Sequence, residues 1–390
     1  MSDQAEKLSI EVSSGLSTVS AEQWDACAGG DNPFISYAFL SALEESGSVA
    51  REEGWLPQHL LVKDANGCLL GAAPAYLKSH SQGEYIFDHA WADALERAGG
   101  RYYPKFLSAV PFTPVTGPRL LVSERNGTAA KSFVQKALAS GMMELASQME
   151  LSSVHINFVE EDLVEELTPL GFLERWGEQF HWFNQGYESF EDFLSELSSR
   201  KRKAIKKERR SVAETEVKLS AVTGDDLTVS HWDAFFEFYT STSDRKWGWP
   251  YLTREFFDIL HQTMRDKCVL IVGEYGGEFV CGALNLRGSD CLYGRNWGCT
   301  QNAKFLHFEA CYYQALDFAI EQRLARVEAG AQGYHKLQRG YLPTKTRSLH
   351  WIREQGFSDA IENYLGQEKR AVQQQLDALM EESPFKKENG

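Results

Sequence analysis

The sequence predicts an α+β protein built from two similar halves, each with a mixed sheet and helices packed against it. The main observation is that one order of elements occurs twice along the chain: a β-hairpin, a further strand, a helix and a closing strand. The length of 390 residues also fits two domains of roughly 100–200 residues each. Apolar residues make up 43% and charged residues 24%, which is typical of globular domains rather than of disordered chains.

The first half opens with a hairpin at Asn66-Gly67, because Asn-Gly between two apolar runs is a strong hairpin signal. The helix expected over residues 128–148 carries apolar side chains at helical spacing. Asp88 precedes a helical stretch through Arg97 and is interpreted as its N-cap rather than as a catalytic residue. Strands are expected at residues 58–63, 68–77, 105–110, 119–122 and 153–158.

The second half repeats this order around a Gly276-Gly277 turn. A helix is expected over residues 305–323 and a last helix over 367–381, followed by a loose tail. Strands are expected at residues 268–274, 278–286, 291–299 and 325–330.

These assignments divide the chain into three parts. Residues 1–186 form a first module, 187–212 a basic helical connector, and 213–390 a second module that is expected to carry the active site.

Cysteine usage and missing motifs exclude several classes of protein. The seven cysteines include no Cys-x-x-Cys pair, which argues against structural zinc, an iron–sulfur cluster and a disulfide framework, and no metal site is expected. The chain has no G-x-x-x-x-G-K-[ST], G-x-S-x-G, H-E-x-x-H or strand-borne G-x-G-x-x-G pattern. Its first residues are polar, and no apolar run approaches the ~20 residues of a membrane helix, so a cytoplasmic protein without a membrane span is expected.

The charge distribution is uneven. The net charge is −15, yet the run Arg200–Arg210 contains eight Lys or Arg residues and one acidic residue, Glu208. Three interpretations stay open for this run: a solvated helix face, an electrostatic site for an anionic substrate or cofactor, and an RNA-binding surface. No aromatic residue interrupts the run, which disfavours stacking on single-stranded RNA.

Candidate site residues begin in the third strand of the second half. Because side chains alternate between the faces of a strand, Arg295 and Trp297 are expected on one face. Asn296 is expected on the other face, between Gly294 and Gly298. Glycines inside a strand mark either the close approach of a ligand or a bulge or tight helix packing, and both interpretations stay open.

The following helix places Glu309 near the middle of its apolar side. A carboxylate directed into a core must be paired, hydrogen-bonded or protonated, which makes Glu309 a candidate acid or base. A structural ion pair with Arg295 or another buried arginine is the alternative.

The segment from Val327 to Tyr341 combines an acidic strand residue with a turn rich in glycines and cations. Strand ends that open into such turns are common ligand sites, and turn amides can hold an anion. We therefore expect a functional site here. Its candidate residues are Glu328, Gln332, Gly333, His335, Lys336, Arg339 and Tyr341.

Several long segments carry a family resemblance: GEYIFDHAWADALERAGGRYYPKFLSAVPFTPVTGPRLL, SRKRKAIKKERR, LYGRNWGC, LHFEACYYQALDFAI and VEAGAQGYHKLQRGYLP. They resemble the bacterial Fem-like (peptidoglycan biosynthesis/recognition) family, which is assigned to the acyl-CoA N-acyltransferase, or GNAT, superfamily. The resemblance spans roughly residues 57–351. It implies two tandem GNAT-like modules.

In that fold, the pantetheine arm of an acyl-CoA lies where two neighbouring strands separate, and an amine attacks the thioester directly. The resemblance places this separation between the strands at 291–299 and 325–330. It makes acyl-CoA or CoA the expected co-substrate, and a backbone N–H near Asn296–Trp297 the group that polarises the thioester carbonyl.

The resemblance also implies acid–base roles. Glu328 or Glu309 is the expected general base for the amine, and Tyr341 or Tyr334 is expected to protonate the leaving thiolate. One departure is clear, because Gln301–Leu306 lacks the glycines of the superfamily's pyrophosphate loop, Gln/Arg-x-x-Gly-x-Gly/Ala.

The leading hypothesis is an N-acyltransferase that moves an acyl or aminoacyl group from a CoA thioester to an amine, with its active site between the two halves. Its partners would be a small-molecule acyl donor and an amine acceptor. One alternative is an aminoacyl-tRNA-dependent transferase related to peptidoglycan cross-bridge synthesis. Fem-type relatives use aminoacyl-tRNA, and the Arg200–Arg210 helix would suit a tRNA backbone. Another alternative is a non-catalytic protein that binds cell-wall fragments.

Overall fold

The computed structural model describes residues 8–123, 127–246, 250–301, 303–330 and 333–386. The chain forms two compact units, each made of two separate stretches of sequence. The first unit contains Met1–Gly177 and Thr346–Gln373, and the second contains Glu178–Lys345 and Gln374–Gly390.

The boundaries of these two units differ from the boundaries expected at residues 186 and 212. Strands β9 (Leu173–Phe183) and β15 (Leu342–Ile352) each contribute residues to both units, so a C-terminal stretch returns to the first unit. The expected connector at 187–212 belongs to the second unit, because its helix packs there through Ile205. Hydrophobic periodicity locates strands but not their partners, which is why these boundaries were missed.

The first unit contains two sets of strands, with the orders β1-β3-β4-β7 and β2-β5-β6-β8-β15. The hairpin at Asn66-Gly67 is confirmed, since β3 and β4 pair antiparallel. The return strand expected as one run is instead two strands separated at Pro74, whose missing N–H cannot continue a ladder. The strands are β1 (Ser9–Ser13), β2 (Trp55–Pro57), β3 (His59–Lys63), β4 (Leu69–Ala73), β5 (Ala75–Lys78), β6 (Lys105–Ser108), β7 (Leu121–Val122) and β8 (Ser153–Val159).

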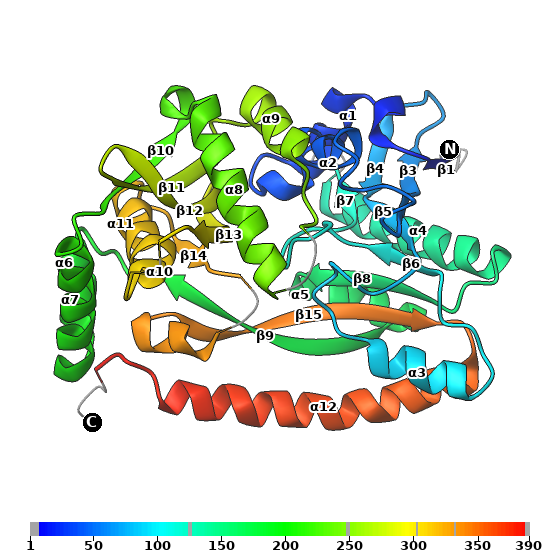
Figure 1. Cartoon of the computed structure of the whole chain (residues 1–390). Coiled ribbons are helices and arrows are strands. Elements are labelled where there is room, and N and C mark those ends of the chain that lie inside the picture. The colour runs from blue at the N-terminus through cyan, green and yellow to red at the C-terminus, as the bar shows by residue number, and fades with distance from the viewer. Residues whose placement is uncertain (1–7, 124–126, 247–249, 302, 331–332, 387–390) are drawn as a thin grey trace. The chain divides into compact units, whose positions relative to one another are not determined.

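Helix α4 (Gly127–Gln148) covers this unit's core, where Val134, Leu138 and Met142 pack with residues of β3 and β8 (Figure 1). Its apolar spacing was the basis of the helix expected there. The other helices are α1 (Ala21–Ala28), α2 (Tyr37–Glu45), α3 (His89–Arg97) and α5 (Glu161–Leu167).

The last helix, α12 (Gln355–Glu381), begins earlier than the expected Gln367. The Glu354 carboxylate accepts hydrogen bonds from the N–H groups of Gly356 and Phe357, which are among the unpaired donors of the first turn. A negative side chain at this end also suits the helix dipole.

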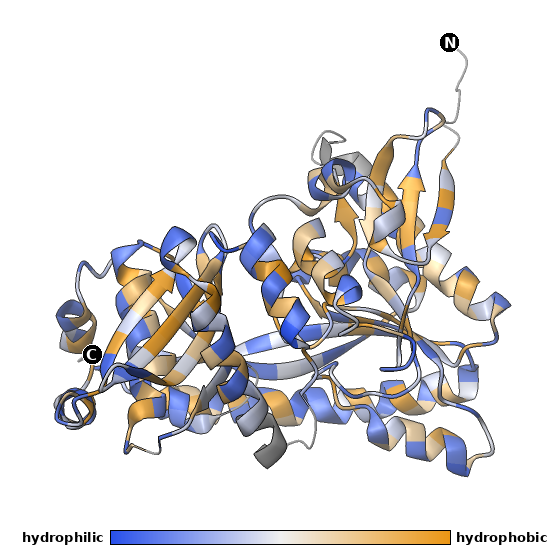
Figure 2. Cartoon of the chain, turned by 45° about the horizontal axis from the view of Figure 1, so that its top comes forward, coloured by the Kyte–Doolittle hydropathy of each residue, from blue (hydrophilic) through white to orange (hydrophobic). Residues whose placement is uncertain are grey.

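The second unit contains one run of strands with the order β10-β11-β12-β13-β14-β9. The Gly276-Gly277 hairpin is confirmed by the antiparallel pairing of β11 and β12. Figure 2 shows that apolar and polar residues both occur along strands of the chain. Besides β9, the strands of this run are β10 (Lys218–Thr223), β11 (Cys268–Tyr275), β12 (Glu278–Arg287), β13 (Cys291–Cys299) and β14 (Arg326–Glu328).

The helix expected over 305–323 is not a single α-helix. It consists of α10 (Leu306–Phe308), a π-helical turn η6 (Glu309–Tyr313) and α11 (Gln314–Glu321). Such π turns often occur at functional sites. The remaining helices are α6 (Phe190–Glu196), α7 (Ser199–Ala213), α8 (Val229–Lys246), α9 (Arg254–Thr263) and the 3₁₀ helix η7 (Tyr334–Arg339).

The tail after α12, expected to be loose, is bonded to the second unit as far as the structure describes it. The Ser198 N–H donates to the Pro384 carbonyl, and the Lys386 N–H donates to the Glu196 carbonyl, both at 2.9 Å. Phe385 packs against the core of this unit. Among the described helices, none is long and apolar enough to cross a membrane.

Candidate active site

The ladder between β13 and β14 ends where a separation of the two strands was expected. In the described ladder they run parallel and pair Cys291–Tyr293 with Arg326–Glu328, after which β14 ends while β13 continues. Gly294 is the first residue of β13 beyond the ladder. A Cβ added there would meet ordinary contacts at 3.4 Å or more, so the backbone at this point is not tightly covered.

The expected alternation of side chains along β13 is wrong after this point. The register of β13 against β12 shifts between Gly294 and Trp297, with one extra residue in β13, which is a β-bulge. As a result Gly294 and Trp297 lie on the same face. Arg295, Asn296 and Trp297 are each half-buried. The extra residue of a bulge leaves backbone groups outside the ladder, as the expected carbonyl-polarising N–H requires.

Gly298 has a packing role rather than a ligand role. It pairs with Gly282, and both face helix α8. A Cβ on Gly298 would lie 2.1 Å from the carbonyl oxygen of Phe238 in α8. Only glycine therefore permits this approach of α8 to the sheet, and of the two glycines only Gly294 lies where an added Cβ would meet ordinary contacts.

Glu328 lies on the same sheet face as Tyr293 and His181, its partners in the neighbouring strands. Its side chain is 4% exposed, and Oε1 accepts a hydrogen bond from Arg326 Nε at 3.2 Å. Oε2 lies 3.9 Å from His181 Nε2 and has no hydrogen-bond partner among the described residues. Burial lowers the pKa of His181, which keeps the imidazole neutral. The described residues thus leave one oxygen of the Glu328 carboxylate without a hydrogen-bond donor.

The imidazole of His307 in α10 contacts the rings of both Trp297 and His335. The ring centroids of Trp297 and His307 are 5.4 Å apart, and those of His307 and His335 are 6.0 Å apart. His335 Nε2 lies 2.8 Å from the Tyr312 hydroxyl. This aromatic chain lies on the Gly294 face of β13, whereas Glu328 lies on the opposite face, so the predicted residues do not form one cluster.

The cations of the turn are directed inward. Arg339 stacks 3.4 Å from the ring centroid of Phe308 and donates to both oxygens of Glu208 in α7, at 2.9 and 3.0 Å. Lys336 is 3% exposed and donates to the Gly330 carbonyl at 2.9 Å. Burial lowers the pKa of Lys336 to about 8, so this amine can lose its proton near neutral pH.

Two further residues of the expected set lie at this turn. Gly333 has a φ of 120°, which favours glycine, and it leads into η7. Gln332 lies outside the described residues.

Glu309 forms the ion pair that was one of its two interpretations, and its partner is Arg209 rather than Arg295. Arg209 of α7 donates to its Oε1 from Nε at 3.2 Å and from a terminal nitrogen at 3.0 Å, and Gln314 donates at 2.9 Å. Arg209 also bonds Asp317 at 2.6 Å. The buried carboxylate is therefore neutralised from the basic helix, not from Arg295, and this favours a structural role for Glu309.

Tyr341 is fully buried in the core of the second unit, beside Tyr312 and Leu337. Its hydroxyl has no hydrogen-bond partner within the described part of the chain, and burial raises its pKa well above the usual value. These surroundings argue against the expected role in protonating a leaving group. Tyr334, by contrast, is 58% exposed.

Asp88 occupies the N-cap position of α3, as expected, but its side chain makes no capping hydrogen bond with the described residues. It contacts Lys105 and Tyr102 instead. The signal that was missed is a pair of lysines, Lys78 and Lys105, within otherwise apolar strands of the first unit.

Comparisons with known proteins agree with this fold. A family model described as FemAB-like, peptidoglycan biosynthesis/recognition, matches residues 15–387. A search of curated proteins gave no match.

Among solved structures, FemX is similar with a TM-score of 0.55 and 12% identity, covering 88% of this chain and 98% of that one. The C-terminal domain of a putative lysylphosphatidylglycerol synthetase from Agrobacterium fabrum has a TM-score of 0.52 and 8% identity, covering 87% and 95%. L-PGS from Bacillus licheniformis has a TM-score of 0.50 and 10% identity, covering 83% and 92%. The fold is thus of the expected α+β class and is shared with FemX and with the synthetase domain.

Proposed function

Because the chain belongs to the FemAB-like family of peptidoglycan biosynthesis/recognition proteins, we propose that it transfers an aminoacyl group from aminoacyl-tRNA to an amine. Family and fold together support an acyl or aminoacyl transferase. The choice of a tRNA-linked donor over a CoA thioester depends on helix α7 and on the loop before α10.

The main support for a tRNA-linked donor is the exposed face of α7. Arg200, Lys203, Lys207 and Arg210 are all exposed, and their spacing of three, four and three residues places them on one side of the helix. None of the four has an ion-pair partner among the residues that the structure describes. In a protein of net charge −15, such a row is a site for a phosphate backbone.

The opposite face of α7 connects this cationic row to the turn at β14. Glu208 holds Arg339 of η7, and Arg209 holds Glu309 at the start of the π turn. A nucleic acid bound along the exposed face of α7 would therefore lie against a helix bonded to the site residues.

The loop before α10 disfavours a CoA pyrophosphate. Residues Gln301–Leu306 contain no glycine, and the α-helix begins only at Leu306 and gives way to the π turn after Phe308. A glycine-rich loop that leads into a regular helix start presents several free N–H groups to a pyrophosphate, and the segment before α10 has neither feature.

The proposed reaction uses groups at the separation of β13 and β14. The acceptor nitrogen attacks the ester carbonyl carbon, whose oxygen is polarised at the bulge over Arg295–Asn296. A new C–N bond forms, the C–O bond to the ribose breaks, and the ribose oxygen takes up a proton. Glu328 and Lys336 are the candidate acceptors for the proton that the amine loses.

Filter binding of aminoacyl-tRNA across a salt series tests the donor. The double variant Lys203→Gln/Lys207→Gln should lower the slope of log affinity against log salt by about one for each phosphate that the helix no longer neutralises. Lys131→Gln/Lys136→Gln in the first unit removes the same charge elsewhere and should leave the slope unchanged. Binding that is equal in all three proteins, or absent at low salt, would reject the tRNA-linked donor.

A further inference from the structure

The first unit contains a buried cluster of charged residues that the proposed function does not use. Lys78 of β5 and Lys105 of β6 are opposite each other across the two strands, and both are fully buried. Glu84 and Asp88, from the segment between β5 and α3, are 3% and 1% exposed. Burying four charged groups is costly unless each one is paired.

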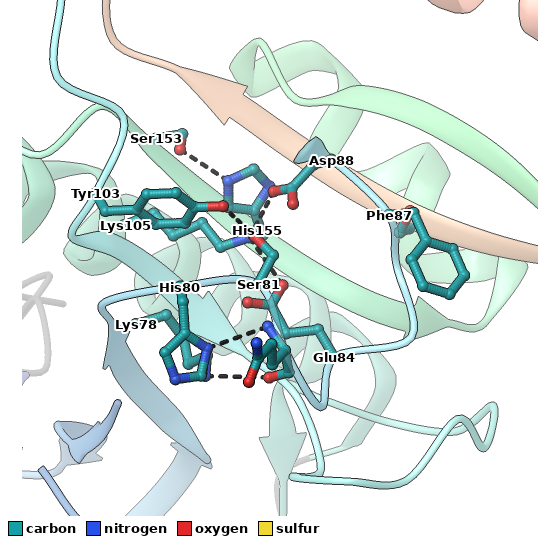
Figure 3. A network of polar contacts seen from close by, with 12 residues as sticks. Lys78, His80, Ser81, Glu84, Phe87, Asp88, Tyr103, Lys105, Ser153 and His155 are labelled. Carbon is teal, nitrogen blue, oxygen red and sulfur yellow. Dashed lines mark hydrogen bonds and ion pairs between the residues drawn. The ribbon is translucent and has the colours of Figure 1, made fainter. Parts of the chain in front are cut away.

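Lys105 is the centre of this cluster (Figure 3). Its ammonium donates to Ser81 Oγ at 2.8 Å, to Glu84 Oε2 at 2.8 Å and to Asp88 Oδ2 at 2.5 Å. These three bonds use all its N–H donors. Asp88 Oδ2 also accepts from the Tyr102 hydroxyl at 2.6 Å.

The other oxygen of each carboxylate is unused. Glu84 Oε1 and Asp88 Oδ1 are buried and have no hydrogen-bond partner in the described part of the chain. Lys78 does not reach them, since its ammonium lies over the Trp55 ring and bonds the Gln82 carbonyl at 3.2 Å. For these two carboxylate oxygens, the partner that the described residues do not supply is a hydrogen-bond donor.

Neighbouring imidazoles do not supply this donor. His155 and His350 share a hydrogen bond of 2.6 Å between their Nδ1 atoms, and His155 Nε2 bonds Ser153. Burial lowers the pKa of both, to about 3 for His155, so both are neutral at physiological pH. They form an uncharged boundary to the cluster.

We propose that this cluster binds a primary ammonium group, held by the free oxygens of Glu84 and Asp88. A primary ammonium carries three N–H donors and one positive charge, which matches two unpaired carboxylate oxygens beside a single committed lysine. A phosphate or carboxylate ligand would face these same oxygens and be repelled.

Charge balance supports this ligand class. Burial raises the pKa of Glu84 to about 7 and lowers that of Lys78 to about 7, whereas the Lys105 ammonium lowers that of Asp88 in spite of burial. Without a ligand, the state with a proton on Glu84 and none on the Lys78 amine leaves the charges of Lys105 and Asp88 balanced. A bound ammonium replaces that proton, and two ammonium groups then face two carboxylates. Binding near pH 7 should therefore release up to about one proton.

The groups that influence this titration come from several elements of the unit. They are Lys78, His80, Asp88, Tyr102, Tyr103, Lys105, His155, Arg175 and His350.

The cluster lies beneath a segment without helix or strand, residues 79–88. Gln82 and Phe87 of this segment are exposed. Ser81 Oγ contacts the half-buried Tyr103 hydroxyl at 2.8 Å, so a single hydroxyl separates Lys105 from the partly exposed Tyr103. Because Glu84 and Asp88 belong to this segment and are buried, the proposal requires the segment to move when a small ammonium enters.

If the amine of the proposed transfer binds here, the cluster is its recognition site, and this step rests on the proposed function. Ammonium binding itself does not, because it is measured without tRNA or any acyl donor. The two proposals can therefore fail separately.

Calorimetric titration of the full chain with methylammonium chloride tests the site. We expect saturable binding, with proton release seen as a dependence of the measured heat on buffer ionisation enthalpy at pH 7. Tetramethylammonium has the same charge but no N–H donor and should bind at least about tenfold more weakly. Equal responses to both ions, or no saturable binding of methylammonium, would overturn the proposal.

A matched pair of variants locates the site. Glu84→Gln keeps the side-chain size and removes the charge, and it should weaken methylammonium binding at least about tenfold. Asp93→Asn, at an exposed position on α3, removes one charge nearby and should leave binding unchanged. Unaltered binding in Glu84→Gln would contradict the proposal. If that variant fails to fold, the comparison of methylammonium with tetramethylammonium in the natural protein still tests the proposal.

Discussion

The approach of helix α8 to Gly298 predicts a large loss of stability when this glycine gains a side chain. In Gly298→Ala the new Cβ would lie 2.1 Å from the Phe238 carbonyl oxygen and 2.4 Å from its carbon. Carbon–oxygen contacts need about 3.3 Å, so backbone must move by about 1 Å. Overpacking costs about 1–3 kcal/mol, and because the obstacle is backbone, we expect about 3 kcal/mol.

Gly294→Ala is the matched control in the same strand. Its Cβ would meet ordinary contacts at 3.4 Å or more, so the free energy of unfolding should change by less than about 1 kcal/mol. Its methyl group narrows the separation of β13 and β14, and aminoacyl-tRNA binding should weaken. Urea unfolding of both variants and filter binding of Gly294→Ala measure these effects. Equal stabilities for the two variants would refute the bulge-based assignment of faces, and unchanged donor binding in Gly294→Ala would refute the role of the separation.

Three other outcomes are expected. Tyr341→Phe should keep or raise stability in thermal unfolding, because it removes a buried hydroxyl without a partner in the described residues; a loss above about 1 kcal/mol would contradict this. Glu208→Gln should cost about 2 kcal/mol in urea unfolding, since it leaves the guanidinium of Arg339, 8% exposed, without its carboxylate; an unchanged midpoint would argue against this pair. His155 and His350 stay neutral in the folded protein but take up protons near pH 6.5 in the unfolded chain. Their contribution to the free energy of unfolding is therefore present above pH 6.5 and is lost as pH falls, by up to about 1.4 kcal/mol per pH unit for each histidine. Urea unfolding at pH 7.5, 6 and 5 checks this, and a free energy of unfolding that does not change across the series would contradict it.

Local chemistry in the sequence predicted much of the fold. Asn66-Gly67 and Gly276-Gly277 specify turns by backbone conformation alone, and the helix at 128–148 follows from its own apolar spacing. The repeated order of elements also indicated two related modules. These features depend on neighbouring residues, so one sequence is enough to find them.

The errors concern interactions between distant residues. The bulge that moves Trp297 to the face of Gly294 depends on the register against β12, which alternation within one strand cannot show. Glu309 was correctly expected to need a partner, but Arg209 lies a hundred residues away in sequence. Asp88 occupies a cap-like position, yet Lys105 attracts its carboxylate more strongly than the helix N–H groups do.

The most direct test of the account follows the transferred group itself. The full chain is incubated in parallel with tRNA charged with a labelled amino acid and with labelled acetyl-CoA, each with the same panel of primary amines, and the products are identified by mass spectrometry. We expect label on an amine from the tRNA ester only. Label arriving only from acetyl-CoA, or no transfer above a protein-free blank from either donor, would contradict it.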